Sequence, residues 1–276
     1  MRAKSTHLYQ KALIRETNAT ITMSESLRPI VFITGATSGI GRACALKFSQ
    51  THDVILTGRR EEELQQVAQL CRQNAAHVLC LTLDVRDKTK VLQTVETLPD
   101  EWKNIDVLIN NAGLALGLEK EYEGNTDDWD VMIDTNIKGL LYVTRAIVPL
   151  MVARQKGDII NIGSVAGDAA YANGNVYCAT KAAVKTLSDG LRIDLADTAL
   201  RVTNIKPGLV ETNFSNTRFH GDKERAAKVY TGIKPLTADD IADVAYYAAS
   251  APKHVQIAEV LVLATHQASG SVIYRK

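Results

Sequence analysis

Short apolar runs alternate with longer helix-like stretches along most of this chain, and that alternation limits the folds it can adopt. The first half contains strand-like runs at 29–35, 53–58, 77–85 and 105–113, separated by helix-like stretches at 41–50, 61–73 and 88–98. The runs are rich in β-branched residues and almost wholly apolar, as expected for parallel strands that helices cover on both faces. Repeated βαβ units of this kind predict an α/β fold with a doubly wound, Rossmann-type sheet.

The second half continues the pattern to the end of the chain. It predicts helices at about 126–136, 138–154, 175–197 and 237–250, and strands at 158–164, 201–208 and 259–263. The total is seven strands, and no linker-like segment divides them, so we expect one domain over residues 29–276 with a seven-stranded parallel sheet. Residues 1–28 are polar and precede the first strand, which predicts a disordered tail; a targeting segment is the alternative.

Composition excludes several classes of function. Lys and Arg number 32 against 31 acidic residues, so the net charge of +1 carries no signal for a nucleic-acid partner. No uninterrupted apolar run approaches the ~20 residues of a membrane span, and no secretory signal opens the chain. The cysteines lack CxxC spacing and lie in apolar segments, so we interpret them as small buried residues of a protein in a reducing, cytoplasmic compartment: Cys44, Cys71, Cys80 and Cys178.

A glycine-rich turn, TGATSGIG, joins the first strand to the first helix at residues 34–41. A turn with few side chains lets backbone N–H groups and the positive end of the helix approach a pyrophosphate. Its place in the first βαβ unit favours a dinucleotide site over a simple tight turn. The residues expected to bind the cofactor here are Gly35, Thr37, Ser38, Gly39, Ile40 and Gly41.

The end of the second strand distinguishes the two nicotinamide cofactors. An NAD site places an acidic residue there for the ribose 2′-hydroxyl, whereas a 2′-phosphate requires a cation. This chain has Arg59 and Arg60 after Gly58, and a guanidinium offers forked donors to phosphate oxygens. The sequence therefore predicts NADP, with two solvated arginines at a helix start as the alternative.

Four motifs in order, TGATSGIG, NNAG at 110–113, Ser164 and YCATK at 177–181, resemble the short-chain dehydrogenase/reductase superfamily. The resemblance extends from about residue 30 to residue 263. It implies that further cofactor contacts come from the ends of the third, fourth and sixth strands. By this resemblance they are Asp84, Val85, Asn111, Ala112, Gly113, Pro207, Gly208, Val210 and Thr212.

Within the superfamily, segments such as NNAGLALGLEK and PGLVETNFSNTRFHGD resemble the NADP-dependent 3-hydroxy acid dehydrogenases. That branch oxidises serine, L-allo-threonine and related acids or reduces the semialdehydes, and the resemblance also implies a homotetramer. Cys178 replaces the branch's usual Gly or Ser, and LATHQASG after the last strand departs from its usual ending. The alternative functions are reduction of a ketoacyl or other carbonyl compound and, in another class, a dinucleotide sensor without catalysis.

Tyr177 and Lys181 are four residues apart on one predicted helix, so their side chains share a face. We expect a protonated Lys181 and the oxidised nicotinamide to lower the pKa of Tyr177, so that Tyr177 can exchange the substrate's proton. Tyr177 and Lys181 are both also expected to contact the cofactor. Ser164, at the carboxyl end of a strand, would hold the substrate oxygen. By resemblance, Asn136 would hold a water that connects Lys181 to solvent. The alternative is that Tyr177, Lys181 and Ser164 each have only a structural role.

A 3-hydroxy acid brings a carboxylate, which requires a cation or backbone amides near the nicotinamide. Arg218, in the loop that follows PGLVET, is the predicted ligand, with Lys206 and His220 behind it. The alternative makes Arg218 a solvated lid residue. No cluster predicts a metal.

Overall fold

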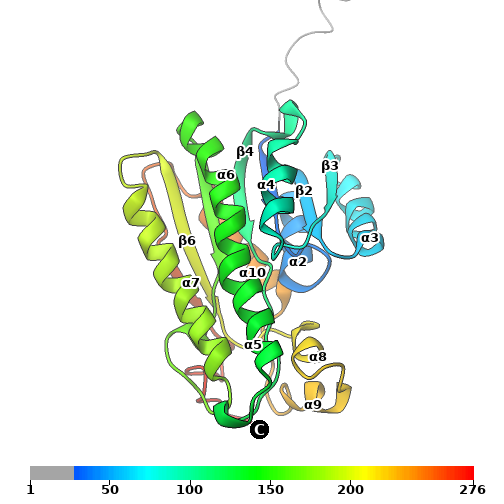
Figure 1. The fold of residues 1–276 in the computed structure, drawn as a ribbon, viewed down its shortest axis with the longest axis vertical. Coiled ribbons are helices and arrows are strands. Elements are labelled where there is room, and N and C mark those ends of the chain that lie inside the picture. The colour runs from blue at the N-terminus through cyan, green and yellow to red at the C-terminus, as the bar shows by residue number, and fades with distance from the viewer. Residues whose placement is uncertain (1–27) are drawn as a thin grey trace, which may run out of the picture.

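The computed structural model describes residues 28–276, and the first 27 residues of the predicted tail lie outside the described part. Its centre is a seven-stranded sheet in the order β3-β2-β1-β4-β5-β6-β7, with every neighbouring pair parallel. The predicted α/β fold with a seven-stranded parallel sheet is confirmed (Figure 1). The strands are β1 (Ile30–Ile33), β2 (Asp53–Gly58), β3 (Val78–Thr82), β4 (Ile105–Asn110), β5 (Gly157–Ile162), β6 (Leu200–Pro207) and β7 (Glu259–Val262).

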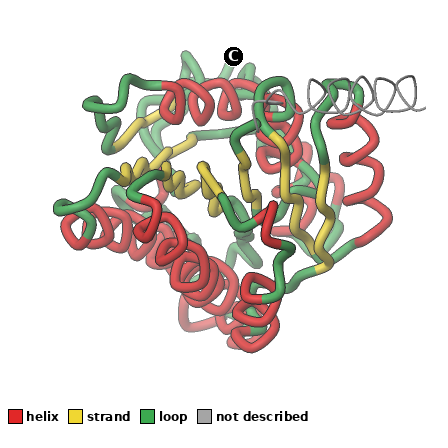
Figure 2. Tube along the Cα trace, turned by 90° about the horizontal axis from the view of Figure 1, so that it is seen from above, coloured by secondary structure: helices red, strands yellow, loops and turns green. Residues whose placement is uncertain are grey.

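Helices cover both faces of the sheet, and Figure 2 shows the strands as a layer with helices on either side. One face packs against α2 (Gly39–Phe48), α3 (Glu61–Arg72) and α10 (Ala238–Ser250). The other face packs against α4 (Lys88–Glu96), α6 (Leu140–Arg154) and α7 (Asn175–Asp194).

The first strand shows why apolar runs form this sheet. Val31 and Ile33 belong to the core under α2 and α3, whereas Ile30 and Phe32 belong to the core under α4 and α6. Successive side chains of a strand point to opposite faces, so a strand that is covered on both sides must be apolar at every position. Three of the four cysteines are buried as expected, Cys44, Cys71 and Cys178, whereas Cys80 on β3 near the edge of the sheet is only half-buried; all four are free thiols.

The helical run from Thr126 to Arg154 differs from the sequence prediction of two helices that meet near residue 137. The structure has α5 (Thr126–Ile133), a π-helical segment (Asp134–Gly139) and then α6 without a break. The run is long and apolar enough to cross a membrane by length and composition. Its packing on α4 and β4, and the buried Asn136 at its centre, identify it as a helix of the α/β fold.

Two short helices, α8 (Phe214–Arg218) and α9 (Lys223–Lys228), follow β6 in a segment that the sequence indicated only as a loop. In Figure 1 they lie together beyond the carboxyl ends of the strands, apart from the helices that flank the sheet. The sheet order reverses between β1 and β4, because β2 and β3 lie on one side of β1 and β5 to β7 lie beyond β4. A ligand site is expected at such a switch point, outside the carboxyl ends of the strands.

Candidate active site

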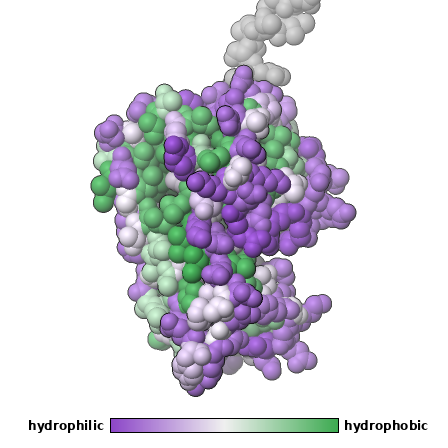
Figure 3. Space-filling model, viewed as in Figure 1, coloured by the Kyte–Doolittle hydropathy of each residue, from purple (hydrophilic) through white to green (hydrophobic). Residues whose placement is uncertain are grey.

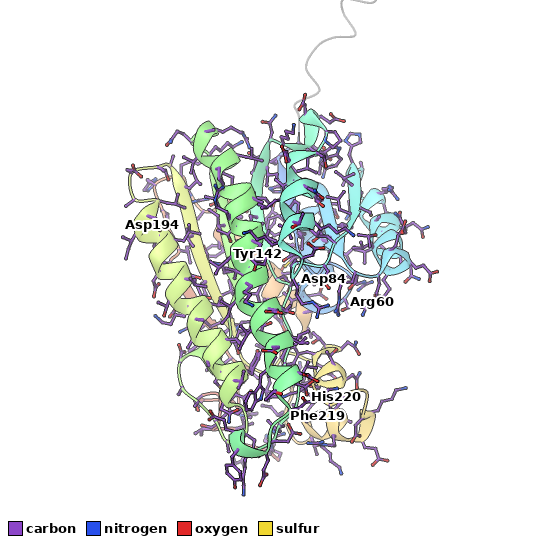
Figure 4. All side chains as sticks on the ribbon, viewed as in Figure 1. Arg60, Asp84, Tyr142, Asp194, Phe219 and His220 are labelled. Carbon is purple, nitrogen blue, oxygen red and sulfur yellow. The ribbon has the colours of Figure 1, made fainter. Side chains whose placement is uncertain are left out.

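A cleft of about 520 Å³ opens at the carboxyl ends of the strands, between the glycine turn after β1 and the segment that carries α8. Arg60 and Asp84 lie on the sheet side of this region, and Phe219 and His220 lie on the segment that faces it (Figure 4). Every predicted site residue except Gly41 and Asn136 lines the cleft. The fold therefore brings nearly all of the predicted cofactor and catalytic residues to one place.

The glycine turn has the backbone shape that a pyrophosphate cradle requires. Gly35 and Gly39 have φ values of +66° and +53°, a conformation that L side chains rarely adopt. Gly41 is buried and lies behind the cleft, where a Cβ atom would collide with the carbonyl of Gly35 and the amide of Asn111. Its role is thus close packing of α2 against the turn rather than contact with a ligand. The residues of the turn fit a dinucleotide phosphate.

Asn111 links the end of β4 to this turn. Its Nδ2 atom donates to the carbonyl oxygens of Thr34 and Gly35 at 2.9 and 3.1 Å. The hydroxyl of Thr34 in turn accepts from the backbone N–H groups of Asn111 and Ala112, both at 3.0 Å. This predicted cofactor contact therefore fixes the shape of the cradle.

The two arginines at the end of β2 differ in their surroundings. Arg60 forms an ion pair with Glu63 and donates from Nη2 to the hydroxyl of Thr37 at 3.2 Å. Arg59 is exposed and lines the cleft, and within residues 28–276 its side chain makes no hydrogen bond or ion pair. Its guanidinium is thus the freer of the two to bind a phosphate.

Asp84, another predicted cofactor contact, is bound to a neighbouring cation, Arg86. Its carboxylate accepts from Nη2 of Arg86 at 2.6 Å and from Nε at 3.0 Å. This hydrogen bonding holds the pKa of Asp84 below its ordinary value. The carboxylate therefore stays ionised, with part of its acceptor capacity already used by Arg86.

Tyr177 and Lys181 leave α7 on the same face and enter the inner end of the cleft, beside Ser164. Both are buried, at 8% and 6% exposed. The Nζ atom of Lys181 lies 6.0 Å from the centre of the Tyr177 ring. Ser164 follows β5, where its hydroxyl accepts from the N–H of Ala166 at 3.1 Å. The predicted catalytic group is assembled at one point of the cleft.

Within the chain's own residues burial dominates the electrostatics of this pair, and the expectation that Lys181 and the oxidised nicotinamide together lower the pKa of Tyr177 stays a prediction. Burial raises the pKa of Tyr177, and hydrogen bonding to Ser164 and the charge of Arg218 oppose the rise only in part. Burial also lowers the pKa of Lys181 from 10.5 to about 8. Burial is the dominant effect because both groups lie away from water. The chain's own residues thus hold Tyr177 as a neutral phenol.

Asn136 lies behind the cleft in the π-helical segment. Its Oδ1 accepts from the N–H of Leu114 at 2.9 Å, and its Nδ2 donates to Leu114 O at 2.8 Å and Thr180 Oγ1 at 3.0 Å. The side chain therefore clamps the loop after β4 to α7, one residue from Lys181. A π-turn also alters the regular hydrogen-bond pairing of the helix, a feature that is frequent at functional sites.

Arg218 reaches the cleft from the end of α8. Its Cζ atom lies 5.5 Å from the ring centres of both Tyr171 and Tyr177. The two cations expected behind it are engaged elsewhere and do not line the cleft. Lys206 pairs with Asp168 and Glu259, and His220 lies 3.0 Å from Asp128.

Several residues of the cleft carried no signal in the sequence. Phe214 packs against the Tyr177 ring with centres 5.6 Å apart. Gln267, from the C-terminal segment, accepts from the N–H of Leu209 at 2.8 Å and so supports the loop after β6. Arg275 donates to the carbonyls of Val229 and Thr231. Other wall residues that sequence reasoning missed are Leu114, Leu118, Val165, Tyr171, Phe219, Tyr230 and Ile273.

Comparisons with known proteins show which family this chain resembles. The model of the short chain dehydrogenase family matches residues 29–223. An NADP-dependent 3-hydroxy acid dehydrogenase, YdfG of Salmonella typhi, is 49% identical over 249 residues, which cover 89% of this chain and 99% of the relative. An NADP-dependent 3-hydroxy acid dehydrogenase of Schizosaccharomyces pombe is 44% identical, with coverages of 89% and 96%.

A solved structure has a similar fold. The closed form of a serine dehydrogenase complexed with NADP⁺ is 46% identical, with a TM-score of 0.84. The match covers 90% of this chain and 99% of the solved one. The similarity thus includes both the part that forms the cleft and nearly the whole length of the known protein.

Proposed function

Because this chain belongs to the short-chain dehydrogenase family, we propose that it is an NADP-dependent oxidoreductase that interconverts small 3-hydroxy acids and their semialdehydes. Serine, L-allo-threonine and 3-hydroxypropionate are the substrates of this type that we propose. The relatives named for NADP and for 3-hydroxy acids support the proposal over most of their length.

One observation carries the proposal. Tyr177, Lys181 and Ser164 lie together at the inner end of a cleft whose outer part has a glycine turn and two arginines, and Arg218 lies beside the Tyr177 ring. A phenol for proton exchange and a cation for a carboxylate are thus adjacent. A 3-hydroxy acid has a hydroxyl and a carboxylate on the same short carbon chain, so its two groups are also close to each other.

The cofactor fits the outer part of the cleft. The turn at Gly35 and Gly39 would hold the pyrophosphate, Arg59 and Arg60 the 2′-phosphate, and the segments at Asp84–Val85 and Asn111–Gly113 the adenosine. The loop from Pro207 to Thr212 would face the nicotinamide. When bound, NADP accepts the hydride from the carbon that bears the hydroxyl and NADPH returns it in the reverse direction.

The chain's own side chains carry out the proton transfer. In oxidation Tyr177 takes the hydroxyl proton of the substrate while Ser164 donates a hydrogen bond to the same oxygen; in reduction Tyr177 gives the proton to the carbonyl oxygen. The neutral phenol that burial favours is the form that reduction needs. Lys181, held behind the phenol, contributes positive charge, and Asn136 fixes the loop and helix between which Lys181 lies.

The oligomer is part of the proposal, as is a cytoplasmic location. Leu141 and Ile193 are exposed on α6 and α7, and hydrophobic residues gather on that side of the molecule in Figure 3. Further exposed apolar residues lie on α10, β7 and the C-terminal segment: Tyr247, Leu261, Val272 and Tyr274. Exposed apolar residues on these elements favour subunit interfaces, and we propose a homotetramer, which light scattering would detect.

The test is a substrate panel followed by nicotinamide absorbance. Serine, L-allo-threonine, 3-hydroxypropionate and the matching semialdehydes would each be assayed with NADP(H) and with NAD(H), beside simple alcohols and a ketoacyl thioester. We expect the highest kcat/KM for a 3-hydroxy acid or its semialdehyde with the phosphorylated cofactor. A ketoacyl thioester as the best substrate would contradict the substrate class and leave the family assignment intact.

A further inference from the structure

The position of Arg218 depends on a second tyrosine that has no part in the proton transfer. The Nη1 atom of Arg218 donates to the hydroxyl of Tyr171 at 2.9 Å, and Nε donates to the carbonyl of Gly117 at 3.1 Å. The backbone carbonyl of Arg218 also accepts from the N–H of Gly117 at 3.0 Å. These contacts fix both the backbone and the side chain of Arg218 from across the cleft.

The Tyr171 ring packs beside two glycines, and at Gly174 the ring occupies the space that a side chain would fill. A Cβ atom at Gly174 would overlap the ring, and one at Gly270 would lie 3.6 Å from its Cδ1 atom. Tyr171 also closes a turn, because the N–H of Gly174 donates to its carbonyl at 3.0 Å. The ring is therefore confined between the segment before α7 and the C-terminal segment, with its hydroxyl directed at Arg218.

The hydrogen-bond count of the guanidinium shows what remains for a ligand. Arginine has five N–H donors, and the two contacts above use one on Nε and one on Nη1. Within the described residues 28–276 no carboxylate pairs with Arg218. Burial raises the pKa of Tyr171, so the phenol stays protonated beside the guanidinium and keeps its own O–H as a donor.

We propose that Tyr171 is the positioning residue for substrate-carboxylate recognition: its hydroxyl holds Arg218 beside Tyr177 so that the remaining donors meet the carboxylate of the substrate. The inference rests on the proposed function, and it assigns the preference for acids to the pair of Tyr171 and Arg218. A guanidinium without this contact would have more rotamers to sample, and each bound carboxylate would have to fix it again. Loss of the contact between Tyr171 and Arg218 should therefore weaken substrate binding and leave the chemical step unchanged.

The experiment compares a substrate with its neutral counterpart. 3-Hydroxypropionate and 3-hydroxypropionamide share the reacting hydroxyl, and only the first has a carboxylate. The ratio of their kcat/KM values with NADP would be measured for the parent and for Tyr171→Phe, Arg218→Ala and the double variant. Tyr246→Phe is the matched control, because it removes a phenol hydroxyl that bonds to Thr51, outside the cleft and away from Arg218.

We expect Tyr171→Phe to lower the acid-to-amide ratio about tenfold through a higher KM for the acid, since a hydrogen bond to a charged group is lost. The kcat for the acid, the kinetics with the amide and the affinity for NADPH should change little. Arg218→Ala should lower the ratio further, and adding Tyr171→Phe to it should have almost no additional effect. The Tyr246→Phe ratio should match the parent's.

Other outcomes separate this inference from the function on which it rests. An unchanged ratio in Tyr171→Phe beside a lowered ratio in Arg218→Ala overturns the role of Tyr171 and leaves Arg218 as the ligand. Equal losses with acid and amide, or a full extra loss in the double variant, would make Tyr171 a general packing residue. A parent that does not prefer the acid contradicts the proposed function and the inference together.

Discussion

Lys181 donates a hydrogen bond of 2.8 Å from Nζ to the carbonyl oxygen of Ile162, so a buried ammonium of α7 is held at the end of β5. Ser164 follows two residues later, and Tyr177 lies one helical turn before Lys181. A single contact between strand and helix thus fixes the relative positions of the three residues that the proposed chemistry requires. The cost of that contact is a lysine whose charge is removed from water.

Burial of Lys181 should give the stability a pH dependence of known sign. Its pKa in the folded protein is about 8, below the ordinary 10.5. The folded protein therefore binds fewer protons than the unfolded chain between these values, and the stability of the parent rises with pH through this window. Lys181→Met removes the titrating group, so between pH 7 and 9.5 the parent should gain about 2 kcal/mol of unfolding free energy relative to the variant.

Urea denaturation of both proteins at the two pH values would measure this gain. Lys185→Met is the control on the same helix, because the hydrogen bond from Lys185 to Asp189 raises the pKa of the lysine instead of lowering it. The parent should show no such gain over that variant. Identical pH dependence in the parent and Lys181→Met would mean that the ammonium is solvated after all.

Cofactor preference should depend more on Arg59 than on Arg60. Arg60 is already bound to Glu63 and Thr37, whereas the Arg59 guanidinium has no such partners in the described residues. A charge-assisted contact is worth about 1.5–3 kcal/mol, so Arg59→Ala should weaken NADP binding roughly tenfold or more. NAD binding should change little. Fluorescence titrations of both cofactors would test it, and equal weakening of the two would contradict a contact with the 2′-phosphate.

Arg28 should contribute to stability although it precedes the first strand. Its guanidinium donates to Ser49 O at 2.5 Å, after α2, and to Asn74 O and Ala75 O at 3.2 Å, after α3. A cation at two helix C-termini satisfies terminal carbonyls and favours both helix dipoles. Arg28→Ala should lower the unfolding free energy by about 1–3 kcal/mol. Turnover should stay at the parent's level, and a loss below about 0.5 kcal/mol would contradict the capping role.

Most of the fold could be predicted because its strands are buried on both faces. DVILTG was expected at 53–58 and is β2, since a short, mostly apolar run of β-branched and aliphatic residues suits a strand that helices cover on both faces. The π-helical segment was not predicted. An extra residue in a helical turn shifts the apolar period, and in sequence that shift resembles the end of one helix and the start of another.

The site was predictable where one short segment carries the chemistry and hidden where two distant segments share it. The glycine turn and the Tyr177–Lys181 spacing are local patterns, so their meeting in one cleft was expected. The contact between Tyr171 and Arg218 joins segments 47 residues apart and has no local pattern. Lys206 appeared to be a second cation for the substrate, yet β7 supplies Glu259, which pairs with it. Only the register of the sheet contains that information.

The central claim is that Tyr177 exchanges the substrate's proton. Tyr177→Phe keeps the ring against Phe214 and removes only the hydroxyl, so the fold and NADPH binding should persist. The comparison variant is Lys181→Ala, which should lower turnover and also weaken cofactor binding, because we propose that its ammonium contacts the cofactor as well.

The most direct measurement is therefore kcat of Tyr177→Phe with NADP and the best 3-hydroxy acid, on protein shown to bind NADPH as the parent does. General acid–base catalysis contributes ~10²–10⁴-fold, and we expect turnover to fall by at least the lower of these factors. A variant that keeps more than about a tenth of the parent's turnover would show that another group exchanges the proton, because the loss would lie far below the range of acid–base catalysis.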